Sequence, residues 1–270
     1  MLSSRRLDQV LEHEKDDLTV TVEAGIRLSA LNARLAPHGQ MLALDPPGDP
    51  TVGEILAGDL FGPRSFRYGR PRDLVLGTTL VLADGTIASA GGKVVKNVAG
   101  YDLARLVCGS AGRLGFIARA SLRLHPLPAS ARTLVVAVGE ADHARLAIRR
   151  LLASGLVPSA VDLLWPSFLA VLLEGSEVGV EAQVKLGKRL LDAHVDDSVW
   201  SEVAKRQEAA MSRAHVPLGE IVSPSRADLP DGLIRVGPTC FVYEAARRES
   251  TWSALAERVR VQFDPEGVLA

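Results

Sequence analysis

Residues 45–77 read DPPGDPTVGEILAGDLFGPRSFRYGRPRDLVLG, and the composition of this stretch differs sharply from that of the rest of the chain. Prolines stand at positions 46, 47, 50, 63 and 71, and glycines stand at 48, 53, 58, 62 and 69. This spacing breaks any long regular element, and long loops so rich in glycine are usually functional or mobile. We therefore expect a loop whose main chain a ligand can approach closely.

Regular elements are expected on both sides of this loop. Residues 18–23 alternate between apolar and polar, which is the period of a half-buried strand. Ser29 is expected to cap a short helix that stops before Pro37. After the loop we expect a strand over 74–83, a turn at Asp84-Gly85, a helix over 103–108 capped by Asp102, and a strand over 116–124.

The second half of the chain predicts an alternating α+β pattern. The apolar periodicity indicates strands over 134–138, 161–164, 169–173 and 240–243, and helices over 141–153, 180–191 and 199–214. Glycine becomes scarcer after the segment His125-Pro126-Leu127-Pro128. We therefore place a domain boundary near Pro128.

Composition limits the classes of function. Lys and Arg total 31 against 32 Asp and Glu, so the net charge of −1 provides no long-range attraction to nucleic acid. The cysteines, Cys108 and Cys240, are too few and too distant for a disulfide framework, which favours a cytosolic location. Since no apolar run is long enough to span a bilayer, we expect membrane contact only through partner subunits.

Four arginines at positions 64, 67, 70 and 72 alternate with Phe66 and Tyr68. Such a cluster can bind a phosphate, a carboxylate or an acidic partner. It can equally be a solvated loop face on which Asp73 pairs with one arginine. The residues alone leave both interpretations open, and the loop matches neither the Walker nor the Rossmann spacing.

A second group of polar residues follows the strand expected over 74–83. Lys96, Asn97 and Tyr101 offer a cation, an amide and a phenol that could stabilise an anionic flavin or a substrate oxyanion, although a solvated loop is also possible. The glycines at 109, 112 and 115 fit either ligand contact or tight packing of a helix on a strand. The six histidines show no metal-ligand spacing, and the sequence identifies no catalytic base.

The ordered set of motifs in the first half of the chain resembles one known family. The set comprises Asp45-Pro46-Pro47, Thr51-Val52-Gly53, Gly62-Pro63-Arg64, Gly69, Arg72–Gly77, Asp84-Gly85, Lys96–Asp102 and Gly109–Ile117. As a whole it resembles the FAD-binding subunit of bacterial glycolate oxidase, in the vanillyl-alcohol-oxidase or PCMH-type superfamily. The resemblance is strong over about Leu7 to Pro128, and Phe263–Leu269 looks like the family's closing Asp-Pro-x-Gly turn.

The resemblance implies an α+β fold with two domains. A partial PCMH-type FAD-binding domain over 1–128 would precede a ferredoxin-like α+β cap domain, of the C-terminal FAD-linked oxidase type, over 129–270. The family's diphosphate-loop segment would lie upstream of Leu7, so we expect weakened FAD binding in its absence. No metal site is implied. The positions placed near the flavin are Pro46, Thr51, Gly53, Gly58, Gly62, Tyr68, Gly69, Lys96, Asn97, Tyr101 and Ile117.

The resemblance also implies a function. The subunit would bind FAD and help to oxidise glycolate, or another small 2-hydroxy acid, to the 2-oxo acid. Its partners would be a second flavoprotein subunit and an iron-sulfur subunit that receives the electrons. An alternative is a non-catalytic assembly subunit that keeps the fold and binds FAD weakly or not at all. A flavin-dependent reductase of the cell-wall-precursor type is a third hypothesis, which the 96–102 stretch disfavours.

Overall fold

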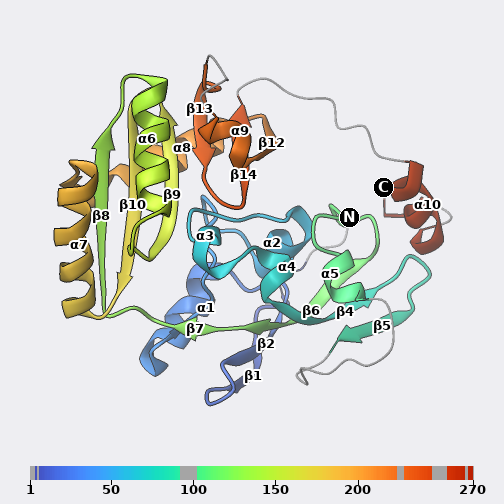
Figure 1. Ribbon diagram of the computed structural model, residues 1–270. Helices are drawn as coiled ribbons and strands as arrows, with labels where there is room; N and C mark the ends of the chain where they lie inside the picture. Colours follow the sequence, from blue (N-terminus) through green and yellow to red (C-terminus); the bar gives the residue numbers. More distant parts are fainter. Residues whose placement is uncertain are drawn as a thin grey trace. The chain divides into compact units, whose positions relative to one another are not determined.

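Two antiparallel sheets organise the chain, and each has its own hydrophobic core (Figure 1). The computed structural model describes residues 4, 6–91, 102–223, 228–244, 254–264 and 267–269. The chain divides into two compact units. Unit 1 comprises Met1–Gly62, Gly69–Leu127 and Ser250–Ala270, and unit 2 comprises Pro63–Tyr68 and Pro128–Glu249.

A five-stranded antiparallel sheet forms the framework of unit 1, in the order β1-β2-β6-β4-β5. Its strands are β1 (Val10–Glu14), β2 (Thr19–Glu23), β4 (Val75–Val81), β5 (Ile87–Gly91) and β6 (Phe116–Arg123). Along β2, Val20 and Val22 are fully buried whereas the threonines between them are half-buried. One face of the sheet therefore packs on a core, as the predicted alternation requires.

Helices cover the apolar face of this sheet. They are α1 (Leu28–Leu35), α2 (Val52–Gly58), α4 (Pro71–Leu74) and α5 (Leu103–Leu106), while the 3-10 turn η1 (Ala36–His38) leads into the strand pair β3 (Gln40–Met41) and β7 (His125–Pro126). Leu31, Ile55 and Leu122 lie in their shared core and are at most 1% exposed. The segment that closes unit 1 contributes α10 (Ala254–Phe263).

Both predicted helix caps in unit 1 can be checked. Asp102 caps α5 as expected, because its carboxylate accepts from the backbone N–H of Arg105 at 3.1 Å. Ser29 is not the N-cap of α1, so that prediction was wrong. The N-cap is Arg27, and the carboxylate of Asp49 accepts from both the N–H and the hydroxyl of Ser29, at 3.0 and 2.8 Å. A carboxylate from the distant loop therefore takes the capping role.

Unit 2 is built on a seven-stranded antiparallel sheet in the order β11-β8-β10-β9-β13-β14-β12. The strands are β8 (Ser130–Ala137), β9 (Pro158–Trp165), β10 (Phe168–Gly175), β11 (His194–Val195), β12 (Ser212–Pro217), β13 (Gly232–Arg235) and β14 (Thr239–Glu244). The helices are α3 (Ser65–Tyr68), α6 (Ala141–Leu152), α7 (Glu177–Leu191), η2 (Asp197–Val199), α8 (Trp200–Ala209) and α9 (Leu218–Val222).

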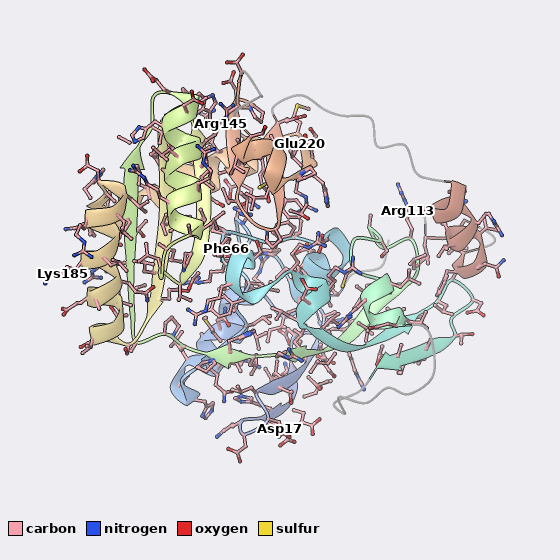
Figure 2. The ribbon with its side chains drawn as sticks, in the orientation of Figure 1. Asp17, Phe66, Arg113, Arg145, Lys185 and Glu220 are labelled. Atoms are coloured by element: carbon pink, nitrogen blue, oxygen red, sulfur yellow. The ribbon has the colours of Figure 1, made fainter. Side chains whose placement is uncertain are left out.

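The order of elements from β8 to β11 is that of a ferredoxin-like unit. The chain runs β8-α6-β9-β10-α7-β11, and the first four strands of the sheet stand in the spatial order β11-β8-β10-β9. Helices α6, α7 and α9 pack on the sheet face that holds Leu134 and Val161, and Phe66 of α3 also contacts this core (Figure 2). Long polar side chains such as Lys185 of α7 point away from it.

The opposite face of this sheet carries a buried ion pair beside α8. Arg235 and Asp162 are at most 1% exposed, and the guanidinium donates to both carboxylate oxygens at 2.9 to 3.3 Å. Gln207 of α8 and the Tyr243 hydroxyl accept from the remaining guanidinium N–H groups, each at 2.9 Å. Because the charges satisfy each other, the cluster fixes α8 on the sheet.

The helix predicted over 199–214 was partly wrong. Helix α8 ends at Ala209, and residues 212–217 form strand β12, which pairs with β14 along its whole length. Ala209 and Ala210 favour a helix over a strand, so the local sequence predicts that the helix continues past its observed end. Residues 212–217 form a strand because they pair with β14, whose residues lie far along the chain.

Candidate functional site

A glycine-lined cavity of about 650 Å³ lies within unit 1. Its wall is formed by the start of α2, the loop after α5, the start of β6 and the turn that follows α10. The lining residues are Ser4, Thr51, Gly53, Glu54, Ala57, Gly112, Gly115, Phe116, Ile117, Val268 and Leu269. Small-molecule sites usually have volumes of about 300 to 1,000 Å³ and largely apolar walls, so this cavity has the size and character of one.

The start of α2 is fixed against the sheet by main-chain contacts. Thr51 and Glu54 form a capping box, in which the Thr51 hydroxyl accepts from the Glu54 N–H and the Glu54 carboxylate accepts from the Thr51 N–H. The N–H of Gly53 donates to the Ala24 carbonyl at 2.7 Å. A Cβ at Gly53 would lie 3.0 Å from the same oxygen, so a side chain there would push α2 away from β2.

A second cavity of about 590 Å³ adjoins the first and contains basic side chains. The two share Ser4, Thr51, Glu54 and Phe116 in their walls. Arg27 and Arg34 line only the second, whereas the one charged side chain among the described residues that line the first is Glu54. Asp8 and Glu54 also line the second cavity, so the pair of cavities joins a largely apolar compartment to one with two arginines and two carboxylates.

The structure brings together only some of the residues that the sequence places at the flavin. Thr51, Gly53 and Ile117 line the glycine-lined cavity. The other described positions lie elsewhere: Pro46 is buried, Gly58 packs beside Leu60, Gly62 packs on the carbonyl of Asp45, and Gly69 lies beside Asp73 with φ +86°. Lys96, Asn97 and Tyr101 lie outside the residues that the structure describes. The roles of all these residues stay predictions.

The segment with Tyr68 and two of the clustered arginines belongs to unit 2. Arg64 donates to the buried carboxylate of Glu174, and Arg67 donates to the Glu174 carbonyl at 3.3 Å and to the hydroxyl of Ser159 at 3.4 Å. The Tyr68 hydroxyl lies 3.5 Å from the Glu174 carboxylate. Burial, followed by the charge of Glu174, raises the pKa of the Tyr68 phenol, so the phenol is a hydrogen-bond donor at neutral pH.

The other two arginines of the cluster lie in unit 1. Arg70 forms an ion pair with Asp59 at 3.2 Å, and Arg72 is exposed. Asp73 accepts from the backbone N–H of Arg70 rather than from a guanidinium. Three of the four arginines therefore have partners within their own unit, and this differs from the expected solvated loop face on which Asp73 pairs with one arginine.

Sequence reasoning missed several residues of the two cavities. Arg27 and Arg34 fall on or beside a helix whose apolar period predicts only packing. Val268 and Leu269 belong to a stretch whose resemblance indicates only a closing turn. The capping box was the signal available for α2, because Thr51 and Glu54 have the spacing of that motif. Gly112 and Gly115 were left open between ligand contact and packing, and both line the glycine-lined cavity.

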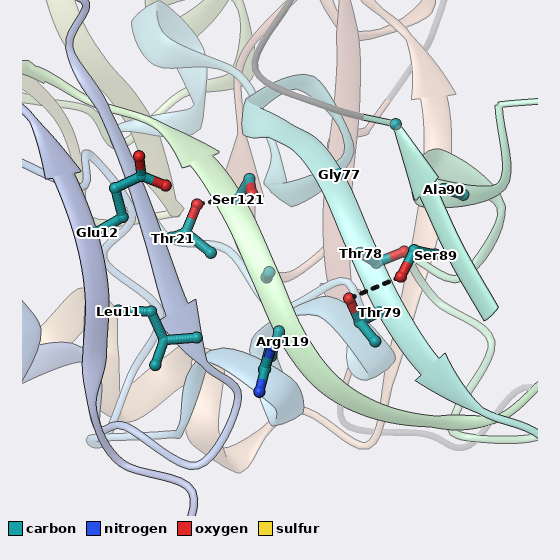
Figure 3. A pocket seen from close by; sticks show the side chains of 12 residues that line it. Leu11, Glu12, Thr21, Gly77, Thr78, Thr79, Ser89, Ala90, Arg119 and Ser121 are labelled. Carbon is teal, nitrogen blue, oxygen red and sulfur yellow. Dashed lines mark hydrogen bonds between the residues drawn. The ribbon is translucent and has the colours of Figure 1, made fainter. Parts of the chain in front are cut away.

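A third hollow, of about 490 Å³, lies over the open face of the five-stranded sheet (Figure 3). Its hydroxyl groups pair across neighbouring strands, Thr21 with Ser121 at 2.9 Å and Thr79 with Ser89 at 3.1 Å. Arg119 projects from β6 between these pairs. Since the four hydroxyls bond to one another, they do not converge on a ligand, and the glycine-lined cavity remains the better candidate.

Other kinds of site find no support in the part of the chain that the structure describes. The described residues hold no group of His, Cys, Asp and Glu side chains that could bind a metal ion. Cys108 and Cys240 are free thiols, and burial is the main cause that raises the pKa of Cys108 to about 12. Among the described helices, none has the length and apolar character needed to cross a bilayer.

Comparisons with known proteins relate the first third of the chain to an FAD-binding family and the fold to that of a solved synthase. Residues 1–91, which include β1 to β5, match the family described as FAD binding domain. The solved structure of an alkyldihydroxyacetonephosphate synthase superposes on 98% of this chain with a TM-score of 0.67, at 15% sequence identity, and the match covers 65% of that chain. The predicted α+β fold, of the PCMH type with a following α+β part, is thereby confirmed.

Named relatives are similar over longer stretches of sequence. Glycolate oxidase subunit GlcE of Escherichia coli is 33% identical over 229 residues, which are 82% of this chain and 63% of that protein. Glycolate oxidase subunit GlcD of Bacillus subtilis is 32% identical over 187 residues, 68% of this chain and 40% of that protein. A D-lactate dehydrogenase of Archaeoglobus fulgidus is 28% identical over 250 residues, 92% of this chain and 54% of that protein.

The chain thus spans between 40% and 63% of the length of these three relatives. Their names describe oxidoreductases of small 2-hydroxy acids, and two of them are named as subunits of a larger enzyme. Residues 1–91 of this chain are therefore similar to an FAD binding domain, and the chain is similar in sequence to glycolate oxidase subunits and to a D-lactate dehydrogenase.

Proposed function

We propose that this chain is the FAD-binding subunit of a 2-hydroxy-acid oxidoreductase complex. The proposed reaction is the oxidation of glycolate to glyoxylate, with the electrons passing to an iron-sulfur subunit, and a second flavoprotein subunit completes the complex. The observation that carries the proposal is the glycine-lined cavity at the start of α2, which lies partly within the segment that matches the FAD binding domain. The names of the similar proteins supply the substrate class.

The residues present fit one FAD molecule laid across the two adjoining cavities. The backbone of Gly53, Gly112 and Gly115 allows close approach of a flat ring, and Ile117 offers an apolar wall. Arg27 and Arg34 in the second cavity would donate to the diphosphate, although Asp8 and Glu54 in the same wall offset part of their charge. When bound, FAD supplies the ring that accepts the electrons of the hydroxy acid.

This chain's own residues would bind and orient the cofactor. The capping box at Thr51 keeps the start of α2 in place, and Phe116 and Ile117 exclude water from the apolar compartment. The geometry of the described residues assigns no general base, so the proton acceptor for the hydroxyl group is not among the roles proposed. Lys96, Asn97 and Tyr101 are proposed to lie near the flavin ring, as the resemblance implies.

One observation favours the second candidate, a non-catalytic subunit that keeps the fold and binds FAD weakly. Glu54 is the charged side chain in the glycine-lined cavity, and its carboxylate would repel a nearby phosphate. Arginines enter only in the adjoining cavity. If the diphosphate has to lie near Glu54, FAD binding would be weak, and the chain would act through its surfaces rather than its cofactor.

Titration with FAD separates the two candidates. The catalytic proposal expects saturable quenching of flavin fluorescence in the micromolar range or below, and the assembly proposal expects none at physiological concentrations. Glycolate and D-lactate are then tested as substrates with an artificial electron acceptor, alone and with the candidate partner subunits, and an enolpyruvyl nucleotide is tested with a reduced nicotinamide as the electron donor. Tight FAD binding without turnover of either hydroxy acid in the complete complex would refute the proposed reaction.

A further inference from the structure

The segment that follows α10 contains a buried carboxylate that holds a turn. The side chain of Asp264 is 1% exposed. Its Oδ1 accepts from the backbone N–H of Val268 at 2.7 Å, and its Oδ2 accepts from the N–H of Leu269 at 3.0 Å. Arg260 places its Nη1 4.0 Å from the same Oδ2. Because both oxygens bind main-chain donors, Asp264 sets the path of the chain at Val268 and Leu269.

The same two residues form a wall of the glycine-lined cavity. Val268 and Leu269 share this cavity with Ala57 and Ile117, and all four present apolar side chains. Val268 is nevertheless 63% exposed, so much of its apolar surface is open to a ligand. A lone exposed valine needs no explanation, but this one stands on a cavity wall that a buried carboxylate holds in place.

Charged side chains of α10 also lie near the loop that contains Gly112 and Gly115. Glu257 of α10 pairs with Arg260 at 2.8 Å, and this hydrogen bond is the main cause that lowers the pKa of Glu257. Arg113 contributes a smaller effect in the same direction. Arg113 lies in the loop between Gly112 and Gly115, and Figure 2 shows it beside α10. The loop with Gly112 and Gly115 and helix α10, which precedes the turn, therefore lie near enough for their charges to interact.

We infer that Asp264 is a positioning residue, and that it holds Val268 and Leu269 as a wall against a planar aromatic ring of the bound dinucleotide. This inference rests on the proposed function, because it assigns the ring to FAD. Without the turn, the apolar compartment is open on one side. The segment following α10 then forms part of the proposed cofactor site and does not serve the fold alone.

The chemistry of the wall favours a ring over a phosphate. The turn contributes aliphatic carbon, and the glycines that line the cavity leave room for a flat group. FAD has two such rings, the isoalloxazine and the adenine, and either meets this description. Riboflavin carries only the first and ADP only the second, so the two compounds distinguish which ring the wall contacts.

Affinity measurements on the full chain test the inference. FAD, riboflavin and ADP are titrated into the unmodified chain and into Val268→Ala and Leu269→Ala. Burial of one methylene contributes enough that each variant should weaken FAD binding by about threefold to tenfold. The same loss of affinity should be seen with riboflavin if the wall contacts the isoalloxazine, or with ADP if it contacts the adenine. Val261→Ala, on α10 and outside the cavity, is the matched control and should leave the affinity unchanged.

Hydrogen exchange tests the positioning role independently of activity. The amides of Val268 and Leu269 should be protected in the unmodified chain and should lose about tenfold or more of this protection in Asp264→Asn. Asp84→Ala is the control, since Asp84 holds a turn at Thr86 in the same unit and does not line the cavity. Unprotected amides in the unmodified chain would overturn the inference.

The outcomes also separate this inference from the proposed function. If the unmodified chain binds none of the three ligands, both the proposed cofactor role and this inference are wrong. If the chain binds FAD and both cavity variants bind it equally well, the inference alone is wrong. Weakened binding in the cavity variants, together with loss of amide protection in Asp264→Asn, supports both.

Discussion

The guanidinium of Arg64 and the carboxylate of Glu174 form a short ion pair in unit 2, with Nη2 2.6 Å from Oε1. Arg64 Nε donates to the same oxygen at 3.0 Å. The Glu174 side chain is fully buried, whereas that of Arg64 is 31% exposed. A short segment interrupting unit 1 is thus held in unit 2 by a charge that has no contact with water.

Replacing Glu174 with Gln should therefore loosen this segment. The change keeps the shape but removes the charge that Arg64 requires, and the Tyr68 hydroxyl loses a charged acceptor, whereas the bond from Arg67 to the Glu174 carbonyl remains. Since Arg64 is partly exposed, water compensates in part, and we expect a loss of about 1 to 3 kcal/mol in the free energy of unfolding. Urea unfolding followed by tryptophan fluorescence measures it. Glu181→Gln, an exposed position on α7, should change stability by less than about 0.5 kcal/mol.

Gly112 and Gly39 provide a matched pair for testing the cavity. Their φ angles are +79° and +66°, and a Cβ at either would meet open space, so a valine should strain the backbone similarly at both. Only Gly112 lines the glycine-lined cavity. We expect Gly112→Val and Gly39→Val to lose about 1 to 2 kcal/mol of stability each. Only Gly112→Val should also weaken FAD binding, by tenfold or more, and equal FAD affinities would contradict the assignment of the cavity.

The Cys108 thiol should react slowly with alkylating reagents. Burial, with the nearby charge of Asp59 as the next cause, raises its pKa to about 12. The thiolate is the reacting species, and a raised pKa lowers its fraction at every pH below that value. At pH 8 we expect alkylation by iodoacetamide about a thousandfold slower than that of a thiol with a pKa near 8.5. Peptide mapping gives the rate, and unfolding in urea should restore ordinary reactivity.

The contact of Asp49 with the start of α1 should lower the pKa of the Asp49 carboxyl. Hydrogen bonds from the backbone and then the side chain of Ser29 lower the pKa of the Asp49 carboxyl below 3.8. The folded form therefore favours the charged carboxylate, so this stabilisation is present above pH 3.8 and is lost as the pH falls through the lowered value. Carbon NMR of the Asp49 carboxyl should show the lowered pKa, and Ser29→Ala should move this pKa back toward 3.8. An unchanged value in Ser29→Ala would contradict the cap.

The elements that the sequence predicts correctly are those whose local pattern suffices. The strand over 116–124 forms as β6 over Phe116–Arg123, and the hairpin at Asp84-Gly85 returns as β5. In each, turn residues and apolar period point to the same structure. Asp102 caps α5 because the backbone N–H that donates to its carboxylate belongs to Arg105, three residues away. Such short-range relations can be read directly from the sequence.

The errors concern relations between distant residues. The partner of Ser29 is Asp49, and the strand that replaces the end of the predicted helix is decided by β14. The candidate site shows the same limit. Thr51, Gly53 and Ile117 meet in one cavity, whereas the contributions of Arg27 and Leu269 depend on how the chain returns to unit 1. No local period encodes such a return.

The division of the chain has a consequence for how the protein is made. Ser250–Ala270 joins unit 1 only after the whole of Pro128–Glu249 has been translated, whereas the residues up to Gly62 are made before it. The nascent chain therefore lacks Val268 and Leu269, two residues of the glycine-lined cavity, throughout the synthesis of the second sheet. A ligand that needs both walls of this cavity should be captured only after residues 268 and 269 have been translated.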